Sequence, residues 1–203
     1  MFSGIIADIG NIKHASDRDG GLRLVIATNT LDLSDVKAGD SIAANGICLT
    51  VVEHTIDSFT VDVSRETLNC TEGLDAIGAP VNLEKALRLA DRLGGHLVSG
   101  HIDGVGEVVE FSNLGESWKL EVRTPQVLAK YIALKGSITI NGVSLTINHV
   151  TGNQVIGSKF SVNLIPHTLV MTNLKNLRAG SRVNLEVDLI ARYVERMLAA
   201  GKA

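Results

Sequence analysis

Two side chains in this sequence have the chemistry to move a proton or attack an electrophile. Cys48 stands in the apolar stretch that follows Asn45-Gly46, and a thiol becomes a nucleophile or a proton-transfer group when it ionises. His101 follows Gly100, and an imidazole titrates near neutral pH, which suits a general base. Taken singly, such a cysteine is usually an inert buried residue, and such a histidine is usually structural. Their meaning depends on the elements that position them.

Those elements occur twice, because the chain contains an internal repeat at an offset of 96 residues. Residues 41–50 follow the pattern Ser-Ile-x-x-Asn-Gly-x-x-Leu-Thr, and residues 137–146 repeat it. The second copy carries about five extra residues after Ile147, and the match then resumes, with Val-Asn-Leu-Glu at 81–84 and again at 183–186. Copies of this length indicate complete small domains rather than solenoid units. We expect an N-terminal domain over 1–96, a C-terminal domain over 97–187 and a terminal segment over 188–203.

Each copy consists mostly of short runs rich in β-branched residues. In the first copy we predict strands over 22–26, 49–52, 59–63 and 81–83. Asn45-Gly46 and Asn141-Gly142 lie between such runs, where both residue types tolerate the positive φ of a tight turn. Short strands with frequent turns predict an all-β fold of two small closed barrels, which leave no sheet edge exposed. One helix-like segment is expected in each copy, over 31–36 and 127–134.

The last segment has no counterpart in the first copy. Its apolar residues Ile190, Val194, Met197 and Leu198 recur at i, i+4, i+7 and i+8, which predicts an amphipathic α-helix over 189–200. Such a helix can dock on its own chain or form a seam between subunits, and the pattern leaves both open.

Composition excludes several classes of partner. The net charge is -3 and the basic residues are dispersed, so we expect no nucleic-acid or anionic-lipid partner. No apolar run approaches the roughly 18 residues of a membrane span. The two cysteines, Cys48 and Cys70, form no C-x-x-C pair, which is typical of a cytoplasmic protein with free thiols. His96 and His101 are accompanied by no carboxylate cluster, so no metal site is predicted. A small-molecule partner is favoured.

Six motifs, in order along the duplicated frame, resemble the riboflavin synthases from one end of the chain to the other. They are Met-Phe-Ser-Gly-Ile-Ile at 1–6, Asn-Gly-Ile-Cys-Leu-Thr at 45–50, Glu-Thr-Leu at 66–68, Gly-Gly-His-Leu-Val-Ser-Gly-His at 94–101, Asn-Gly-Val-Ser-Leu-Thr at 141–146 and Leu-Ile-Pro-His-Thr-Leu at 164–169. The resemblance implies two six-stranded Greek-key barrels, each binding one 6,7-dimethyl-8-ribityllumazine. It also implies a homotrimer held by the C-terminal helix, an active site between the N-terminal barrel of one subunit and the C-terminal barrel of its neighbour, and no metal or organic cofactor.

The implied reaction is a dismutation in which one lumazine donates a four-carbon unit to another, giving riboflavin and 5-amino-6-(D-ribitylamino)uracil. Two copies of one binding domain can hold two identical substrates face to face, so that the rate gain comes largely from orientation. Because one substrate is donor and the other acceptor, the two pockets should agree at binding positions and differ at chemical ones. Thr50 matches Thr146 and Thr67 matches Thr168, and their hydroxyls suit a pterin edge and a polyol tail.

At other positions the copies differ. Cys48 is opposed by Ser144, and His101 is opposed by Ile5. On the resemblance, Cys48 is a candidate nucleophile or proton-transfer group and His101 a candidate general base for the acidic 7-methyl group. Ser41, Ser144 and Thr146 are candidates for guiding the nucleophile that adds to the ring. The candidate catalytic residues are therefore Cys48, His101, Ser144, Ser41 and Thr146.

The candidate binding residues follow from the same motifs, with Phe2 expected to cover the site and Lys135 expected to contact the ligand. They are Phe2, Gly4, Ile5, Ile6, Cys48, Leu49, Thr50, Asp62, Val63, Ser64, Arg65, Glu66, Thr67, Gly100, His101, Ile102, Lys135, Ser144, Leu145, Thr146, Asn163, Leu164, Ile165, Pro166, His167 and Thr168. Two positions depart from the family pattern. Asn141 stands where an aspartate is common, and His167 stands where the first copy has Glu66, which leaves the roles of both open.

Two alternative functions share a related barrel. A lumazine-binding or flavin-binding accessory protein would have lost catalysis, and the joint presence of Cys48, His101 and Ser144 favours the enzyme over it. A flavin reductase domain would need an Arg-x-Tyr-Ser/Thr motif and a nucleotide-binding partner domain. Neither Tyr131 nor Tyr193 has that context.

Overall fold

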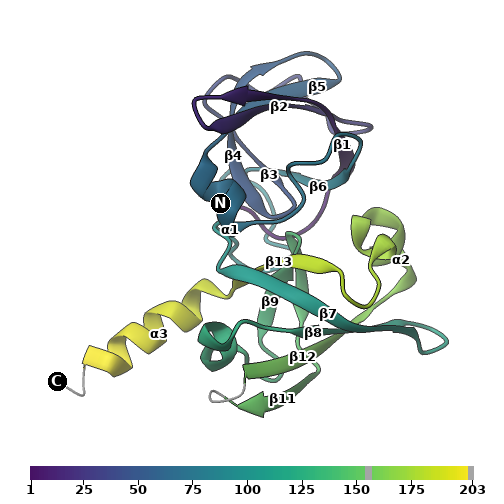
Figure 1. Ribbon diagram of the computed structural model, residues 1–203, viewed down its shortest axis with the longest axis vertical. Helices are drawn as coiled ribbons and strands as arrows, with labels where there is room; N and C mark the ends of the chain where they lie inside the picture. Colours follow the sequence, from purple (N-terminus) through teal and green to yellow (C-terminus); the bar gives the residue numbers. More distant parts are fainter. Residues whose placement is uncertain (154–156, 201–203) are drawn as a thin grey trace.

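The computed structural model describes residues 1–153 and 157–200, which form two β-structures stacked end to end with a helix projecting from the second (Figure 1). The first half contains β1 (Asp8–Arg18), β2 (Gly21–Ala27), β3 (Ser41–Ala44), β4 (Ile47–His54), β5 (Ser58–Val63), α1 (Arg65–Cys70) and β6 (Pro80–Lys85). The second contains β7 (Gly104–Asn113), β8 (Trp118–Arg123), the 3₁₀ helix η1 (Gln126–Tyr131), β9 (Ser137–Ile140), β10 (Val143–Thr146), β11 (His149–Asn153), β12 (Gly157–Leu164), α2 (Pro166–Met171), η2 (Asn173–Asn176) and β13 (Arg182–Val187). The helix α3 (Leu189–Ala200) ends the described chain.

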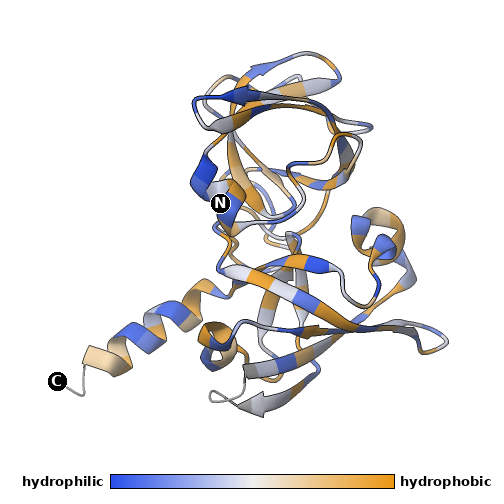
Figure 2. Ribbon diagram, in the orientation of Figure 1, coloured by the Kyte–Doolittle hydropathy of each residue, from blue (hydrophilic) through white to orange (hydrophobic). Residues whose placement is uncertain are grey.

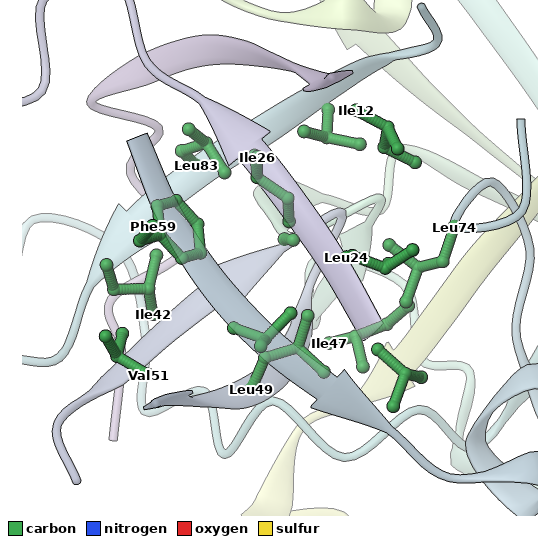
Figure 3. Packing of buried hydrophobic residues seen from close by; sticks show 14 of the residues in the cluster. Ile12, Leu24, Ile26, Ile42, Ile47, Leu49, Val51, Phe59, Leu74 and Leu83 are labelled. Atoms are coloured by element: carbon green, nitrogen blue, oxygen red, sulfur yellow. The ribbon is translucent and has the colours of Figure 1, made fainter. Parts of the chain in front are cut away.

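The first half is a closed antiparallel barrel with the strand order β1-β2-β5-β4-β3-β6. Alternate residues of each strand face the interior, so that Leu24 and Ile26 of β2 and Phe59 and Val61 of β5 are fully buried. Figure 3 shows this core, in which Ile12, Leu74 and Leu83 fill the space between the strands. The barrel predicted for the first copy is confirmed.

The second half is a curled sheet with the order β10-β9-β13-β7-β8-β12-β11, which is the circular order of the first half. The strand equivalent to β4 is divided here into β10 and β11 at Ile147-Asn148, while β4 itself is continuous and only shifts register between Val51 and Glu53. The extra residues of the second copy fall between β11 and β12, which pair antiparallel, and residues 154–156 lie outside the described part. The duplication predicted from sequence is thus present as two related all-β halves.

The two tight turns were predicted correctly, and they lie back to back. Asn45 and Asn141 have φ values of 50° and 48°, and the glycine after each also has positive φ. A Cβ on Gly46 would lie 2.7 Å from the backbone nitrogen of Gly142, and the reverse holds equally. Only glycine permits this contact, so the turns both form the hairpins and join the halves.

Side-chain amides complete the junction between the halves symmetrically. The Nδ2 of Asn82 donates to the carbonyl of Asn141 at 2.9 Å, and the Nδ2 of Asn184 donates to the carbonyl of Asn45 at 3.1 Å. All four residues are buried, so these bonds satisfy groups that water cannot reach.

One predicted helix is absent. Residues 31–36 form a loop, because the Asp8 carboxylate accepts hydrogen bonds from the backbone N–H groups of Asn29, Thr30 and Leu31 and turns the chain there. Three buried side chains of this loop, Leu31, Leu33 and Val36, close one end of the barrel as a plug. The helix expected over 127–134 is the 3₁₀ helix η1.

The short helices α1 and α2 were not predicted, although each carries a start signal. The Ser64 hydroxyl caps α1 by accepting from the N–H of Thr67, and Pro166 opens α2 at the first turn. Both are six residues long, too short to show a helical period.

The C-terminal helix has the predicted bounds and stands away from the sheets (Figure 1). Hydrophobic and hydrophilic residues alternate along its ribbon (Figure 2). Ile190, Val194, Met197 and Leu198 are between 48% and 74% exposed, so the apolar stripe contacts little of its own chain. Ion pairs fix its first half, between Arg192 and Asp103 and between Glu195 and Lys130. None of the described helices is long and apolar enough to cross a membrane.

Candidate active site

Strand alternation places the first group of predicted site residues on the outside of the barrel. In β3 and β4 the side chains of Ile42 and Leu49 enter the core, so Ser41, Cys48 and Thr50 point outward. Ser41 lies directly across the ladder from Thr50. These three outward residues form what we call the first patch, a surface with two hydroxyls and one thiol.

The second half presents the equivalent surface. Ile138 and Ile140 of β9 enter the second core, and the outward residues Ser144 and Thr146 of β10 form the second patch. Thr146 lies across the ladder from Ser137, as Thr50 lies across from Ser41. The repeat therefore matches in three dimensions at the threonines.

Each patch is bordered by the extended segment that precedes the first strand of the other half. We call these segments the first strap, residues 1–7, and the second strap, residues 97–103. The second strap, residues 97–103, lies along β4, where the N–H of Cys48 donates to the carbonyl of Gly100 at 2.8 Å. Gly100 has a φ of +81°, and a Cβ there would lie 2.6 Å from the Cβ of Cys48. This close approach places the exposed His101 beside the first patch, while Ile102 packs against the first core.

The first strap, residues 1–7, makes the mirror contact on the second patch. The N–H of Ser144 donates to the carbonyl of Gly4 at 2.8 Å, and Gly4 has a φ of +77° with no room for a Cβ. Ile5 is half exposed at the patch, and Ile6 packs against the second core. The two straps are joined by a single bridge between Phe2 and Val98. Each strap therefore borders the patch of the half to which it does not belong in sequence.

Two buried glutamates anchor the straps. Glu84 at the end of β6 accepts from the N–H and the hydroxyl of Ser3 and from the N–H of Gly4, at 2.6 to 2.9 Å. Glu186 at the end of β13 accepts from the same groups of Ser99 and Gly100 at 2.7 to 2.9 Å. Burial raises the pKa of Glu84 above its usual value, against the opposing effect of these donors.

A polar segment runs from the end of β5 into α1 in the first half, and its equivalent runs from the end of β12 into α2 in the second half. In the first half Asp62 is paired with Arg23 at 2.7 Å, and the Arg23 guanidinium lowers the pKa of that carboxyl. Ser64 and Thr67 share a hydrogen bond of 2.9 Å at the start of α1. Next to them, Arg65 donates to the carbonyl of Gly20.

The same segment of the second half is built differently. Asn163 takes the place of Asp62, and Ile165 precedes α2 where Ser64 precedes α1. Pro166 and His167 are exposed, while Thr168 is half-buried and accepts at its carbonyl from Thr172. The second half thus offers fewer charges to a ligand than the first.

Several predicted binding residues are buried and offer a ligand almost no surface in this chain. Phe2, Leu49, Val63 and Leu164 are at most 4% exposed, with side chains packed in the interior. Leu145 is also partly buried against the second core. The exposed Lys135 has positive φ and its Nζ lies 3.4 Å from the Oδ1 of Asn148, at the break between β10 and β11. Glu66 accepts from the thiol of Cys70 on the exposed face of α1.

One residue beside the second patch was missed by the sequence analysis, which considered His96 only as a possible metal ligand. The segment is not a strand, and the Nδ1 of His96 lies 2.7 Å from the Ser144 hydroxyl. The backbone N–H of His96 donates to Ser3 at 3.1 Å. The available signal was the Gly94-Gly95 pair before it, since a Cβ at Gly95 would lie 2.9 Å from the Oγ of Ser144.

A pocket of about 410 Å³ opens beside the first patch, within the size range of small-molecule sites. The plug loop and residues Glu84–Asp91 form its walls. Of the predicted site residues it includes Ser41 but neither Cys48 nor Thr50. Of the first patch, Thr50 is exposed on the surface of a single chain, while Cys48 is partly buried outside this pocket.

Comparison with known proteins agrees with this duplicated arrangement. The lumazine binding domain model matches residues 3–86 and again residues 99–188. The chain is similar to the riboflavin synthase of Photobacterium phosphoreum, with 46% identity over 203 residues covering 100% of this chain and 91% of that protein. It is also similar to the riboflavin synthase of Bacillus subtilis strain 168, with 42% identity over 199 residues covering 98% and 90%.

The chain belongs to the riboflavin synthase family. Solved structures of a related protein share its fold. LumP complexed with riboflavin superimposes with a TM-score of 0.82 at 30% identity, covering 92% of this chain and 99% of LumP. LumP complexed with 6,7-dimethyl-8-(1'-D-ribityl) lumazine gives a TM-score of 0.79 with the same identity and coverage. The chain therefore shares its duplicated frame with LumP, which has been solved in complex with riboflavin and with the lumazine.

Proposed function

We propose that this protein converts two molecules of 6,7-dimethyl-8-ribityllumazine into riboflavin and 5-amino-6-(D-ribitylamino)uracil by moving a four-carbon unit from one to the other. The observation that carries the proposal is the presence, in one chain, of two lumazine-binding repeats with equivalent outward patches. The reaction needs two identical molecules and no other reactant, so two copies of one site suffice.

The matched positions bind the substrates. Thr50 and Thr146 are exposed at equivalent places and offer hydroxyls, and the backbone of each strap lies beside them. The remaining contacts come from the segments 62–67 and 163–168 and from Lys135. A neutral, hydroxyl-rich ligand suits such a lining, in which most polar groups are uncharged.

The unmatched positions perform the chemistry. His101 lies next to Cys48 at the first patch, because the hydrogen bond from the Cys48 N–H to the Gly100 carbonyl holds the second strap on β4. His101 acts as general base toward the 7-methyl group of a lumazine, and Cys48 acts as nucleophile or proton carrier. Ser144, Thr146 and Ser41 guide the nucleophile that adds to the other ring.

The active site forms between subunits of a homotrimer. The patches lie on the open surface of one chain, so a second chain is needed to enclose two substrates face to face. The exposed apolar stripe of α3 provides the seam, since such a stripe is stable only when another surface covers it. We place this assembly in the cytoplasm, where the free thiols of Cys48 and Cys70 stay reduced.

One assay tests the activity. Purified protein incubated with 6,7-dimethyl-8-ribityllumazine alone should produce one riboflavin for every two lumazines consumed, as followed by absorbance and chromatography. Tight binding without turnover would instead identify a lumazine-binding accessory protein.

A further inference from the structure

The second strap ends at Asp103, a carboxylate with no equivalent in the first strap. At the repeat offset of 96 residues, Ala7 stands in its place. The backbone N–H of Ala7 donates to the carbonyl of Leu83 at 2.9 Å. That of Asp103 donates to the carbonyl of Leu185, the equivalent position, at 2.8 Å. The backbones of the two straps are therefore anchored alike at this point, and the carboxylate is an addition of the second strap.

The Asp103 carboxylate is buried and has two partners. Its side chain is only 7% exposed. One oxygen accepts from the backbone N–H of Val187 at 2.8 Å, and the other forms an ion pair with Arg192 of α3. A buried carboxylate is stable only where hydrogen bonds and an opposite charge compensate its lost hydration. Arg192 supplies that charge, so α3 is tied to the end of the second strap.

A further contact of α3 reaches the same region. Glu195, three residues after the arginine and on the same helix face, accepts from the hydroxyl of Tyr131 at 2.5 Å and pairs with Lys130. Both partners belong to η1, which packs on the residue after the strap, since a Cβ at Gly104 would lie 3.4 Å from the Cδ1 of Leu128. The base of α3, where the helix leaves β13 in Figure 1, is thus joined by side chains to η1 and to the second strap.

His101 lies between anchors that belong to different halves. On one side of it the Gly100 carbonyl accepts from the Cys48 N–H at 2.8 Å, and on the other side Ile102 packs against the first core. The next residue, Asp103, is held by the second half and by α3. Because each residue has only two soft backbone dihedrals, a displacement of Asp103 is passed on to His101 within two residues.

We propose that Arg192 is a positioning residue for the general base. By holding Asp103 it fixes the end of the second strap, and through the strap it fixes the place of His101 at the first patch. The proposal deepens the proposed function and rests on it, because the placement of His101 affects turnover only if that imidazole removes the proton. The first strap needs no such brace, since its residue at the matching position is Ile5, which takes no proton.

Arg192→Met tests the brace, because it removes the charge and keeps most of the length of the side chain. We expect kcat for riboflavin formation to fall about fivefold, with the KM for lumazine within about twofold of the wild type and an unchanged mass in light scattering. Arg192→Lys returns a charge to the same place and should recover about half of the lost kcat. Arg196→Met, one turn further along α3, removes an equal charge from an exposed position and should keep wild-type kcat.

Hydrogen exchange measures the hold on the strap without any turnover. In Arg192→Met the backbone amides of residues 97–103 should exchange at least about threefold faster than in the wild type, because the end of the strap is released. The amides of residues 1–7, on the first strap, are the internal control and should exchange as in the wild type.

Asp103→Asn breaks the same ion pair from the other side and keeps an acceptor for the Val187 N–H, so it serves as the test if Arg192→Met does not fold. It should reproduce the kcat and the exchange rates of Arg192→Met, and the double variant should lower kcat no further. Wild-type kcat, unchanged exchange over 97–103 or losses that add in the double variant would each overturn the proposal.

A smaller mass in light scattering would also overturn it, because lost assembly would then explain the lower kcat. If the wild-type protein makes no riboflavin from lumazine, the proposed function has failed. The exchange rates still decide in that case whether Arg192 holds the strap.

Discussion

The two halves of this chain share a backbone frame and differ in their chemistry. Which residues are shared and which differ depends on the face of the strand that they occupy. Residues that point inward or that hold the straps are equivalent, as Glu84 and Glu186 show by binding the same three groups. Residues at the centres of the patches are not, with Cys48 in an apolar setting and Ser144 bonded to a buried imidazole. Duplication fixed the geometry, and the outward positions were free to diverge.

The crossing of the straps adds a second lesson. Because residues 1–7 border the second patch and residues 97–103 border the first, neither half completes its own site. The residues that form a stable barrel are therefore not the same set as the residues that complete a patch.

The largest effect is expected from dividing the chain after residue 96. We propose residues 1–96 as a domain, because the barrel closes between β1 and β6 within them. The fragment should fold and bind riboflavin but show no turnover, since it lacks the second strap, His101 and the second patch. Circular dichroism and fluorescence quenching of riboflavin measure the two properties. A fragment that is unfolded where the full chain is stable would contradict the boundary.

Removing the helix α3 should have the next largest effect. Deletion of residues 189–203 leaves both halves intact and removes the exposed apolar stripe, so the protein should become monomeric and lose about a hundredfold in turnover. Ligand binding should persist. Light scattering and the lumazine assay measure both. A monomer with full activity would show that catalysis occurs within one chain.

Substitutions at the unmatched positions of the first patch come third. Cys48→Ser and His101→Gln should each lower kcat more than tenfold and change ligand affinity only a few-fold, because their roles are chemical. Thr50→Ala is the matched comparison and should weaken binding with a smaller effect on kcat. If the rate and the affinity of the Cys48 and His101 variants fall equally, both residues serve in binding.

The smallest effect concerns stability and pH. Since burial raises the folded-state pKa of Glu84 above its ordinary value of 4.5, the folded protein binds this proton more tightly than the unfolded chain does. Its contribution is then full below about pH 4.5 and is lost as the pH rises through the raised pKa. The stability advantage of the wild type over Glu84→Gln, measured in urea titrations, should shrink as the pH rises from 5 to 8. An advantage that does not change with pH would contradict the raised pKa.

Much of the fold could be predicted from the sequence, because the main strand and turn signals occur in both copies of the repeat. Asn45-Gly46 and Asn141-Gly142 identify their turns through the residues that positive φ requires, and the stripe of α3 has the helical period. The loop at 31–36 could not be predicted, since its shape depends on Asp8, a residue distant in sequence that accepts hydrogen bonds from the backbone N–H groups of residues 29–31, where the loop begins.

The candidate site was accessible from sequence where the copies could be compared or where a motif resembled the family. Matching the two copies drew attention to Thr50 and Thr146, and mismatches drew attention to Cys48 and Ser144. The contact of His96 with Ser144 spans 48 residues of chain, so neither matches nor mismatches could reveal it. The crossing of the straps could not be predicted either. Strand patterns carry no information about which half a flanking segment will border.

Mixing two inactive variants tests the central claim most directly, namely that one patch from each half meets across a subunit seam. Cys48→Ser inactivates the first patch of its chain and Ser144→Ala the second, so chains of the two kinds are denatured together, refolded at equal concentrations and assayed with lumazine. If sites form between subunits, about a quarter of them will pair two intact patches by random assembly, and activity will return to roughly that fraction of wild type. Activity no higher than the average of the two variants alone would contradict the account, because it would place both patches of each site on one chain.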